Sequence, residues 1–254
     1  MIATILALGL LTMTQDAADP YQGTLKVVTY NIHHGEGTDG RLDLSRIAAL
    51  IRREDPDVVA LQELDVKTTR VGGVDQLAEL AQATGLHGAF GKAIAYAGGD
   101  YGVGILSRWP LTIIENRALP SSPEREARTA LVARVVTPFG PVRVVSTHLD
   151  HKSVEDRTRQ ASVIASLAGP EPTLVAGDLN DLASSPALAP IAAAFLDAGK
   201  ALDLPTYPSD KPAQRIDYIL AHPKDSWKVV EFRVLDEAIA SDHRPVVAVL
   251  AYGR

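Results

Sequence analysis

Cysteine is absent from this 254-residue chain, which excludes disulfides, thiol catalysis and thiolate metal sites. Histidine, aspartate, glutamate and asparagine therefore remain as metal ligands. An excess of positive charge is also lacking: the formal net charge is −6, so nothing attracts the whole chain to a polyanion such as duplex DNA. Aromatic residues are few, with two Trp and four Phe, and no Trp/Phe-rich loop favours a lipid surface. With 46% hydrophobic residues the chain can still bury a sizeable core.

The first twenty residues differ in composition from the rest of the chain. Residues 2–13 form an apolar run, shorter than the roughly 18 residues of a membrane-spanning helix, and a polar segment of small residues follows. This order resembles a secretory signal peptide, although no Lys or Arg precedes the apolar run. We therefore expect residues 1–19 to be a signal peptide, residues 20–254 to be a single domain, and the protein to be secreted or periplasmic. An amphiphilic N-terminal extension is the alternative.

From Leu25 onward, short apolar runs alternate with helical periodicity. Residues 25–32 predict a strand, and residues 44–51 carry apolar side chains at i, i+3, i+4 and i+7, which predicts an amphipathic helix. Residues 58–61 are continuously apolar and predict a strand buried on both faces, which ends near Glu63.

The second half of the chain repeats this plan. Residues 142–149 predict a strand, residues 161–168 a helix, and residues 174–176 a strand that leads into Asp178. Each half therefore consists of strand, helix, buried strand and acidic residue. This internal duplication predicts an α/β (α+β) fold in which two mixed sheets pack face to face with helices outside. We expect a four-layer αββα sandwich whose polar strand ends meet at one edge.

Polar residues interrupt or end the predicted strands at a few places: Asn31, Glu63, His148, Asp178, Asn180, Asp217, Asp242 and His243. Strand ends hold side chains rigidly, as a catalytic site requires. Carboxylate and amide oxygens without thiolates favour a hard cation such as Mg²⁺. Such an ion neutralises charge on a phosphoryl group, so this set of residue types is typical of hydrolysis at phosphorus.

The ordered motifs of the endonuclease/exonuclease/phosphatase superfamily resemble six segments of this chain: Thr29–Ile32, Gln62-Glu63, Ser146–Leu149, Gly177–Asn180, Arg215–Tyr218 and Ser241–His243. That superfamily includes deoxyribonuclease I, exonuclease III, neutral sphingomyelinases and inositol polyphosphate 5-phosphatases. Six motifs in the same order are far more specific than any one alone. We therefore expect the chain to share its fold and its metal-dependent phosphoesterase chemistry.

The resemblance implies a role for each polar residue that ends a strand. Glu63 would be the principal metal ligand, with Asn31 and Asp242 close to the ion. Asp178 would activate the attacking water, and Asn180 would hold a phosphate oxygen.

Two histidines complete the set that the resemblance implies. His243, oriented by Asp217, would stabilise the phosphoryl charge, and His148 would assist from the other side. His148 also places the chain nearer the deoxyribonuclease I and sphingomyelinase branches than the exonuclease III branch.

Several further residues have both a functional and a structural interpretation. Arg70 lies beside glycines that allow close backbone approach, so it either clamps a substrate phosphate or is solvated. Tyr101 either lies near the site or packs in the core. Arg128 either meets an anionic substrate or pairs with Glu124 and Glu126.

The histidines outside the motifs are also ambiguous. His33 and His34, directly after Asn31, indicate either a second metal ion or only a polar turn. His151 has no supporting context and is interpreted as structural or exposed.

The sequence thus favours a monomeric hydrolase that needs Mg²⁺, with Mn²⁺ or Ca²⁺ as alternatives, and no stable protein partner. A phosphodiester is the favoured substrate, in a small molecule, a lipid headgroup or a nucleic acid. A nuclease and an inactive module that binds phosphorylated ligands are the other candidates. A binding module has no need for Asp178 together with Asp217 and His243, so their presence favours an enzyme.

Overall fold

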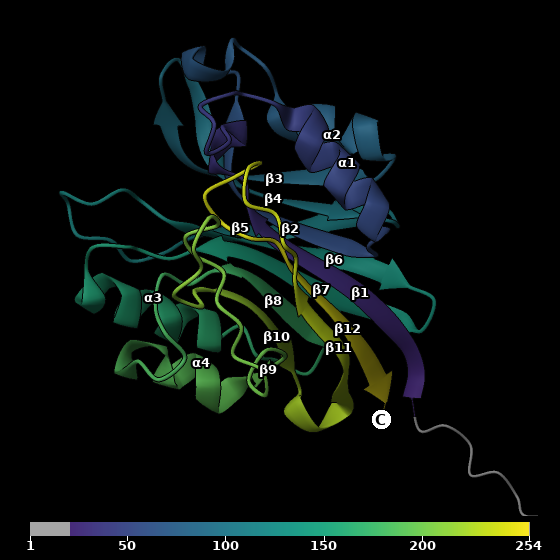
Figure 1. The fold of residues 1–254 in the computed structure, drawn as a ribbon. Coiled ribbons are helices and arrows are strands. Elements are labelled where there is room, and N and C mark those ends of the chain that lie inside the picture. Colours follow the sequence, from purple (N-terminus) through teal and green to yellow (C-terminus); the bar gives the residue numbers. More distant parts are fainter. Residues whose placement is uncertain (1–20, 254) are drawn as a thin grey trace, which may run out of the picture.

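The computed structural model describes residues 21–253, in which two β-sheets pack face to face (Figure 1). The predicted signal peptide of residues 1–19 lies outside the described residues and stays a prediction. Among residues 21–253, no helix is both long and apolar enough to cross a membrane.

The first sheet and its helices come from both ends of the chain: β1 (Tyr21–Asn31), η1 (His33–Gly35), α1 (Leu44–Glu54), β2 (Val58–Val66), η2 (Thr69–Val71), α2 (Gln76–Thr84), β3 (His87–Tyr96), β4 (Gly99–Ser107), β11 (Trp227–Val234) and β12 (Val246–Gly253). Its strand order is β11-β12-β1-β2-β4-β3. β1 and β2 are parallel and joined through α1, whereas β12 and β4 run antiparallel on either side of this pair.

The second sheet and its helices come from the middle of the chain: β5 (Leu111–Ala118), β6 (Thr129–Thr137), β7 (Gly140–His148), α3 (Val154–Ala165), β8 (Thr173–Asp178), η3 (Pro186–Leu188), α4 (Ala189–Ala194), β9 (Leu196–Asp197), β10 (Asp217–His222) and η4 (Lys224–Ser226). Its strand order is β5-β6-β7-β8-β10-β9. The parallel pair β7 and β8, joined through α3, lies between antiparallel β6 and β10.

The two sheets therefore share one arrangement, and the duplication predicted from the sequence is present. Their registers add one detail. Asn31 pairs with Gln62, whereas His148 pairs with Asp178. Gln62 thus occupies the position equivalent to Asp178, and Glu63 lies one residue further along the chain.

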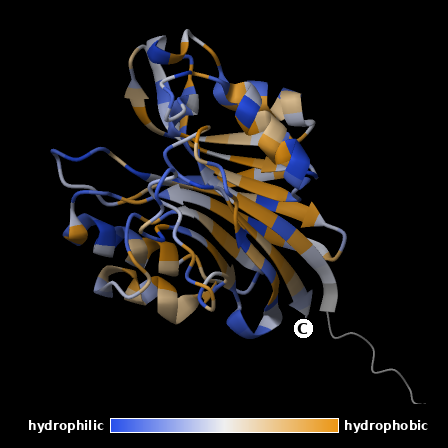
Figure 2. Ribbon diagram, in the orientation of Figure 1, coloured by the Kyte–Doolittle hydropathy of each residue, from blue (hydrophilic) through white to orange (hydrophobic). Residues whose placement is uncertain are grey.

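Alternate residues of the central strands pack in different layers, as the two-residue period of a strand requires. Val27 belongs to the cluster between the sheets, with Ala176 of β8. Val28 belongs to the cluster beneath α1, with Ile51. Ile164 of α3 packs on the outer face of the second sheet. Figure 2 shows the hydrophobic residues concentrated along the central strands, so the four-layer αββα prediction is confirmed.

The ends of α1 fix where β2 begins. The side chain of Asp43 accepts hydrogen bonds from the backbone of Ser45 and Arg46, which satisfies donors at the helix start. Asp55 adopts a left-handed conformation, with φ of 46°, and Pro56 follows, so the helix stops there. The chain then enters β2, which carries Glu63 toward the edge of the sandwich.

Candidate active site

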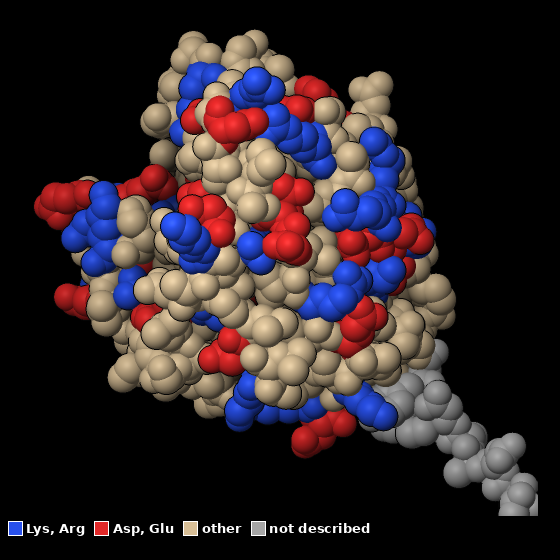
Figure 3. Space-filling view, viewed as in Figure 1, with Lys and Arg blue, Asp and Glu red and all other residues tan. Residues whose placement is uncertain are grey.

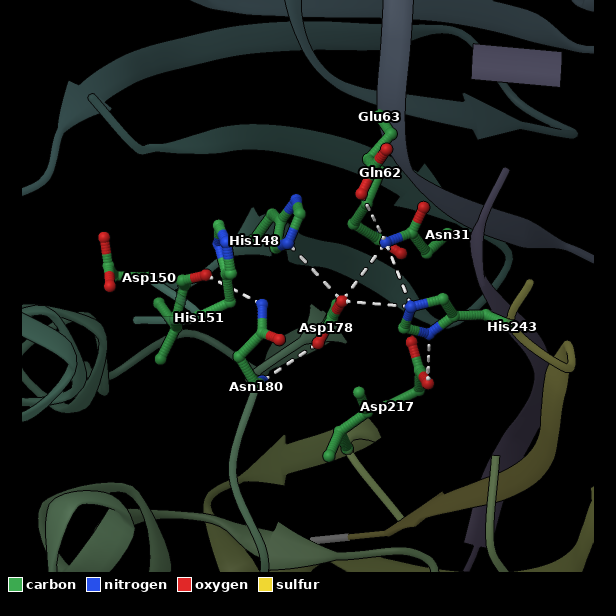
Figure 4. A network of polar contacts seen from close by, with 12 residues as sticks. Asn31, Gln62, Glu63, His148, Asp150, His151, Asp178, Asn180, Asp217 and His243 are labelled. Atoms are coloured by element: carbon green, nitrogen blue, oxygen red, sulfur yellow. Dashed lines mark hydrogen bonds and ion pairs between the residues drawn. The ribbon is translucent and has the colours of Figure 1, made fainter. Parts of the chain in front are cut away.

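The carboxyl ends of the two parallel strand pairs meet at one edge of the sandwich (Figure 4). This edge brings together all eight predicted site residues: Asn31, Glu63, His148, Asp178, Asn180, Asp217, Asp242 and His243. Most of them line a cavity of about 510 Å³. One half of the duplicated fold supplies Asn31 and Glu63, and the other supplies His148, Asp178 and Asp217.

A β-bulge aims Glu63 into the cavity. The pairing of β2 with β4 shifts register between Leu61 and Leu64, and Glu63 has a φ of 59°, in the left-handed region that side chains rarely adopt. Asn31 Nδ2 donates a hydrogen bond to Glu63 Oε1 over 3.1 Å, while Asn31 Oδ1 accepts one from the backbone N–H of His33. In this orientation Asn31 holds the carboxylate and its amide oxygen is already engaged.

Asp178 lies at the centre of the polar contacts (Figure 4). Its Oδ2 accepts a hydrogen bond from Asn31 Nδ2 at 3.1 Å and lies 3.4 Å from His148 Nε2 and 3.6 Å from His243 Nε2. Its Oδ1 accepts a hydrogen bond from the backbone N–H of Asn180. Burial raises the pKa of Asp178 to about 7, although the charge of His243 opposes this shift.

His243 is held as a cation by two carboxylates. Its Nδ1 donates to Asp217 Oδ2 over 2.9 Å, and Thr206 Oγ1 donates to the same oxygen over 2.6 Å. Burial lowers the pKa of His243, but the charges of Asp217 and Asp178 prevail and raise it to about 10. The imidazolium therefore presents its Nε2–H toward Asp178 at neutral pH.

His148 is neutral and is oriented by Arg128. The guanidinium can only donate, so Arg128 Nη1 donates to His148 Nδ1 over 3.1 Å and the imidazole proton lies on Nε2. Burial, together with the charges of Arg128 and His243, holds the pKa of His148 well below its usual value. His148 Nε2–H thus points at Asp178 Oδ2 from the side opposite His243.

Arg128 itself is 4% exposed and forms an ion pair with Glu126 at 2.7 Å. Its other terminal nitrogen lies 3.3 Å from His151 Nδ1. The predicted pairing with Glu126 is present, and the guanidinium also borders the cavity. The structure therefore places Arg128 between two histidines of the site rather than free in solvent.

Arg70 and Tyr101 lie on the cavity wall. Arg70 binds the buried carboxylate of Asp65 through two hydrogen bonds of 2.6 and 2.8 Å and keeps 30% of its side-chain surface exposed, so it is paired and only partly solvated. The guanidinium also stacks over the rings of Tyr96 and Tyr101, at 4.7 and 5.6 Å from their centres. Tyr101 is both packed, at 8% exposure, and part of the cavity lining.

The model of the endonuclease/exonuclease/phosphatase family matches residues 28–243. The chain belongs to this family. The YbhP protein of Escherichia coli is 31% identical over 173 residues, which cover 63% of this chain and 68% of YbhP. A solved endonuclease/exonuclease/phosphatase from Beutenbergia cavernae has a TM-score of 0.78 and 29% identity, covering 91% of this chain and 72% of that one. A mannosyl-6-phosphatase from Bacteroides thetaiotaomicron has the same fold, with a TM-score of 0.69 and 18% identity, covering 90% and 100%.

Endonuclease/exonuclease/phosphatase proteins act on phosphoester bonds and typically need a divalent metal ion, and the donor groups of this member fit such an ion. Within residues 21–253, two groups of three His or acidic side chains bring their ligand atoms within 4.8 Å of one another. They are His33 with His34 and Glu63, and Asp178 with Asp217 and His243. Asp242 lines the cavity and accepts a hydrogen bond from Ser241, but it falls in neither group.

Some cavity residues of this family member carried no signal in the sequence. The ring centres of Tyr207 and His243 lie 4.8 Å apart, and Tyr96 also lines the cavity. Ile216 lines it as well, although its motif, Arg215–Tyr218, pointed only to Asp217 as a site residue. His151 is exposed, as expected, yet it lines the cavity. These residues lie in loops or at strand ends, where the sequence has no hydrophobic periodicity. Their place in the cavity lining therefore becomes visible only in the folded structure.

Proposed function

We propose that this protein hydrolyses a phosphoester, with a phosphodiester favoured, by attack of a water molecule that Asp178 orients and deprotonates. The observation that carries this proposal is the buried Asp178 carboxylate, on which Asn31, His148 and His243 converge. A base is most effective when its pKa lies near the working pH, and burial raises the pKa of Asp178 to about 7.

The two histidines supply hydrogen-bond donors for the charge that develops at phosphorus. His243 is cationic at neutral pH, and His148 donates through Nε2, from opposite sides of Asp178. Asn180 Nδ2 donates one N–H to the Leu149 carbonyl and has a second N–H for a phosphate oxygen. Donors fixed in this way stabilise a phosphoryl transition state more than the ground state.

We propose Glu63 as the principal ligand of a divalent ion, with Asn31 and Asp242 beside it. Such an ion, when bound, would neutralise charge on the phosphoryl oxygens. Carboxylate ligands favour Mg²⁺, with Mn²⁺ or Ca²⁺ as alternatives. The bulge at Glu63 supports this role, because strained backbone is retained where a side chain must be aimed.

The cavity favours a small substrate over duplex DNA. About 510 Å³ is within the range of small-molecule sites, and the chain has a net charge of −6. Figure 3 shows Lys and Arg interspersed with Asp and Glu on the face it displays, without a continuous basic groove. The similar fold of a mannosyl-6-phosphatase adds phosphorylated sugars to the candidate substrates.

The test is hydrolysis by metal-stripped protein, with and without added Mg²⁺, Mn²⁺ or Ca²⁺. The substrates are bis-p-nitrophenyl phosphate, p-nitrophenyl phosphate, sphingomyelin, inositol and sugar phosphates, and plasmid DNA. Asp178→Asn should lower metal-dependent turnover about a thousandfold or more, since it removes the base. Asp225 is exposed and follows the end of β10 that lies opposite Asp217. The substitution Asp225→Asn is therefore the control and should retain full activity. Folded, metal-loaded protein without turnover on any substrate would instead support a phospho-ligand binding module.

A further inference from the structure

Two consecutive histidines lie against Glu63. They belong to η1, directly after β1, and both have positive φ, 45° for His33 and 43° for His34. The ligand atoms of His33, His34 and Glu63 all lie within 4.8 Å of one another. Metal bonds of about 2.0–2.2 Å let one ion reach all three atoms after small side-chain rotations.

His33 has a nitrogen lone pair available for such an ion. Its Nδ1 lies 3.1 Å from the carbonyl oxygen of Glu36, and a carbonyl can only accept a hydrogen bond. The proton therefore lies on Nδ1, and Nε2 carries the lone pair. A backbone carbonyl that fixes the tautomer in this way is the usual support for a metal-binding histidine.

His34 has a buried nitrogen with no partner. Its side chain is largely buried, and its Nδ1 makes no hydrogen bond within residues 21–253. Its Nε2 faces the Glu36 carboxylate at 3.5 Å, which favours the proton on Nε2 and the lone pair on Nδ1. A simple polar turn would not explain this unsatisfied atom.

We propose that His33, His34 and Glu63 form a metal site that prefers a first-row transition ion such as Mn²⁺ or Zn²⁺ over Mg²⁺. The inference rests on the proposed function in taking Glu63 as a metal ligand. Imidazole nitrogens suit transition ions, whereas Mg²⁺ prefers oxygen donors and retains its waters. Two imidazole ligands therefore shift the metal preference of this site away from the Mg²⁺ that carboxylates alone would favour.

Metal binding to the stripped protein, measured by calorimetry without substrate, tests this site. We expect Mn²⁺ and Zn²⁺ to bind at least a hundredfold more tightly than Mg²⁺. His33→Asn and His34→Asn should each lower transition-ion affinity tenfold or more and change Mg²⁺ affinity less than threefold. Asparagine suits these positions because it tolerates positive φ. The exposed His87 of β3 gives the matched control His87→Asn, which should bind as the wild type does.

Pulsed EPR of Mn²⁺ bound to the wild-type protein gives a measurement that needs no variant. We expect couplings from directly bound imidazole nitrogen. Absence of nitrogen coupling, or equal affinity for Mg²⁺ and Mn²⁺, would overturn the inference. These measurements detect metal binding and not turnover. A negative result would therefore leave the proposed Mg²⁺-supported hydrolysis standing, and an absence of hydrolysis would not change the outcome of the binding test.

Discussion

Replacing Asp217 by asparagine would remove one charge from the site and keep its hydrogen bonds. Asp217 Oδ2 accepts from both His243 Nδ1 and Thr206 Oγ1, whereas the buried Oδ1 has no partner among the described residues. An asparagine with its oxygen at the Oδ2 position retains both contacts. Asp217→Asn therefore separates the charge of this residue from its role in orienting His243.

The magnitude follows from the pKa of His243. Its increase from 6.5 to about 10 corresponds to a preference of roughly 5 kcal/mol for the protonated ring. Burial opposes protonation, and Asp217 is the largest favourable influence, so without its charge we expect a pKa near or below 6.5. At pH 7.5 about one tenth or less of His243 would then be protonated. Because only the protonated ring donates through Nε2, loss of this cation should lower kcat/KM at pH 7.5 about tenfold or more.

NMR titration of the His243 ring in metal-free protein measures the pKa directly, and the pH profile of kcat/KM measures its consequence. The basic limb of that profile should move from near pH 10 toward pH 6.5. The raised pKa also contributes stability that is fully present below pH 6.5 and is lost as the pH rises through about 10. The wild type should therefore lose its advantage in unfolding free energy over the variant across that range. A His243 that still titrates near 10 in Asp217→Asn would refute the reasoning.

Three further substitutions test other contacts. Arg128→Gln removes a positive charge beside His148 and should raise the pKa of that ring, which NMR titration measures. It should also lower kcat about 10- to 100-fold with little change in KM, which steady-state kinetics measures. Arg70→Met leaves the fully buried Asp65 carboxylate without its cation and should destabilise the protein by about 2–4 kcal/mol in urea unfolding; a loss below 1 kcal/mol would contradict this. Gly177→Ala would place a Cβ 2.0 Å from a backbone oxygen of β7 and should cost about 1–3 kcal/mol, seen as a lower Tm; an unchanged Tm would show that the strands can separate locally.

The sequence was sufficient to predict the place of a residue in the fold wherever that place follows from the periodicity of a strand or helix. Apolar runs that end in Asn31, His148 and Asp178 located the central strands, and the repeat of this pattern predicted two equivalent sheets. Because the carboxyl ends of both parallel pairs lie at one edge, the residues that end these strands could be predicted from the sequence to form one site.

Contacts between segments distant in sequence could not be read in this way. The partner of Arg70 is Asp65, which lies inside β2, where no pattern distinguishes a buried carboxylate from any strand residue. The bulge that aims Glu63 depends on pairing with β4, and the contact of Tyr207 with His243 depends on a loop path. Such features arise from tertiary packing, to which local periodicity is insensitive.

The position of β12 also determines when the chain can finish folding. This strand lies between β1 and β11 in the interior of the first sheet, although more than 200 residues separate it from β1 along the chain. At about 5–20 residues per second, a ribosome needs on the order of ten to forty seconds to add the missing neighbour of β1. During that interval β1 has an unpaired edge open to chaperones or to other nascent chains. Translation speed and chaperone supply should therefore affect the yield of folded protein more than its final stability.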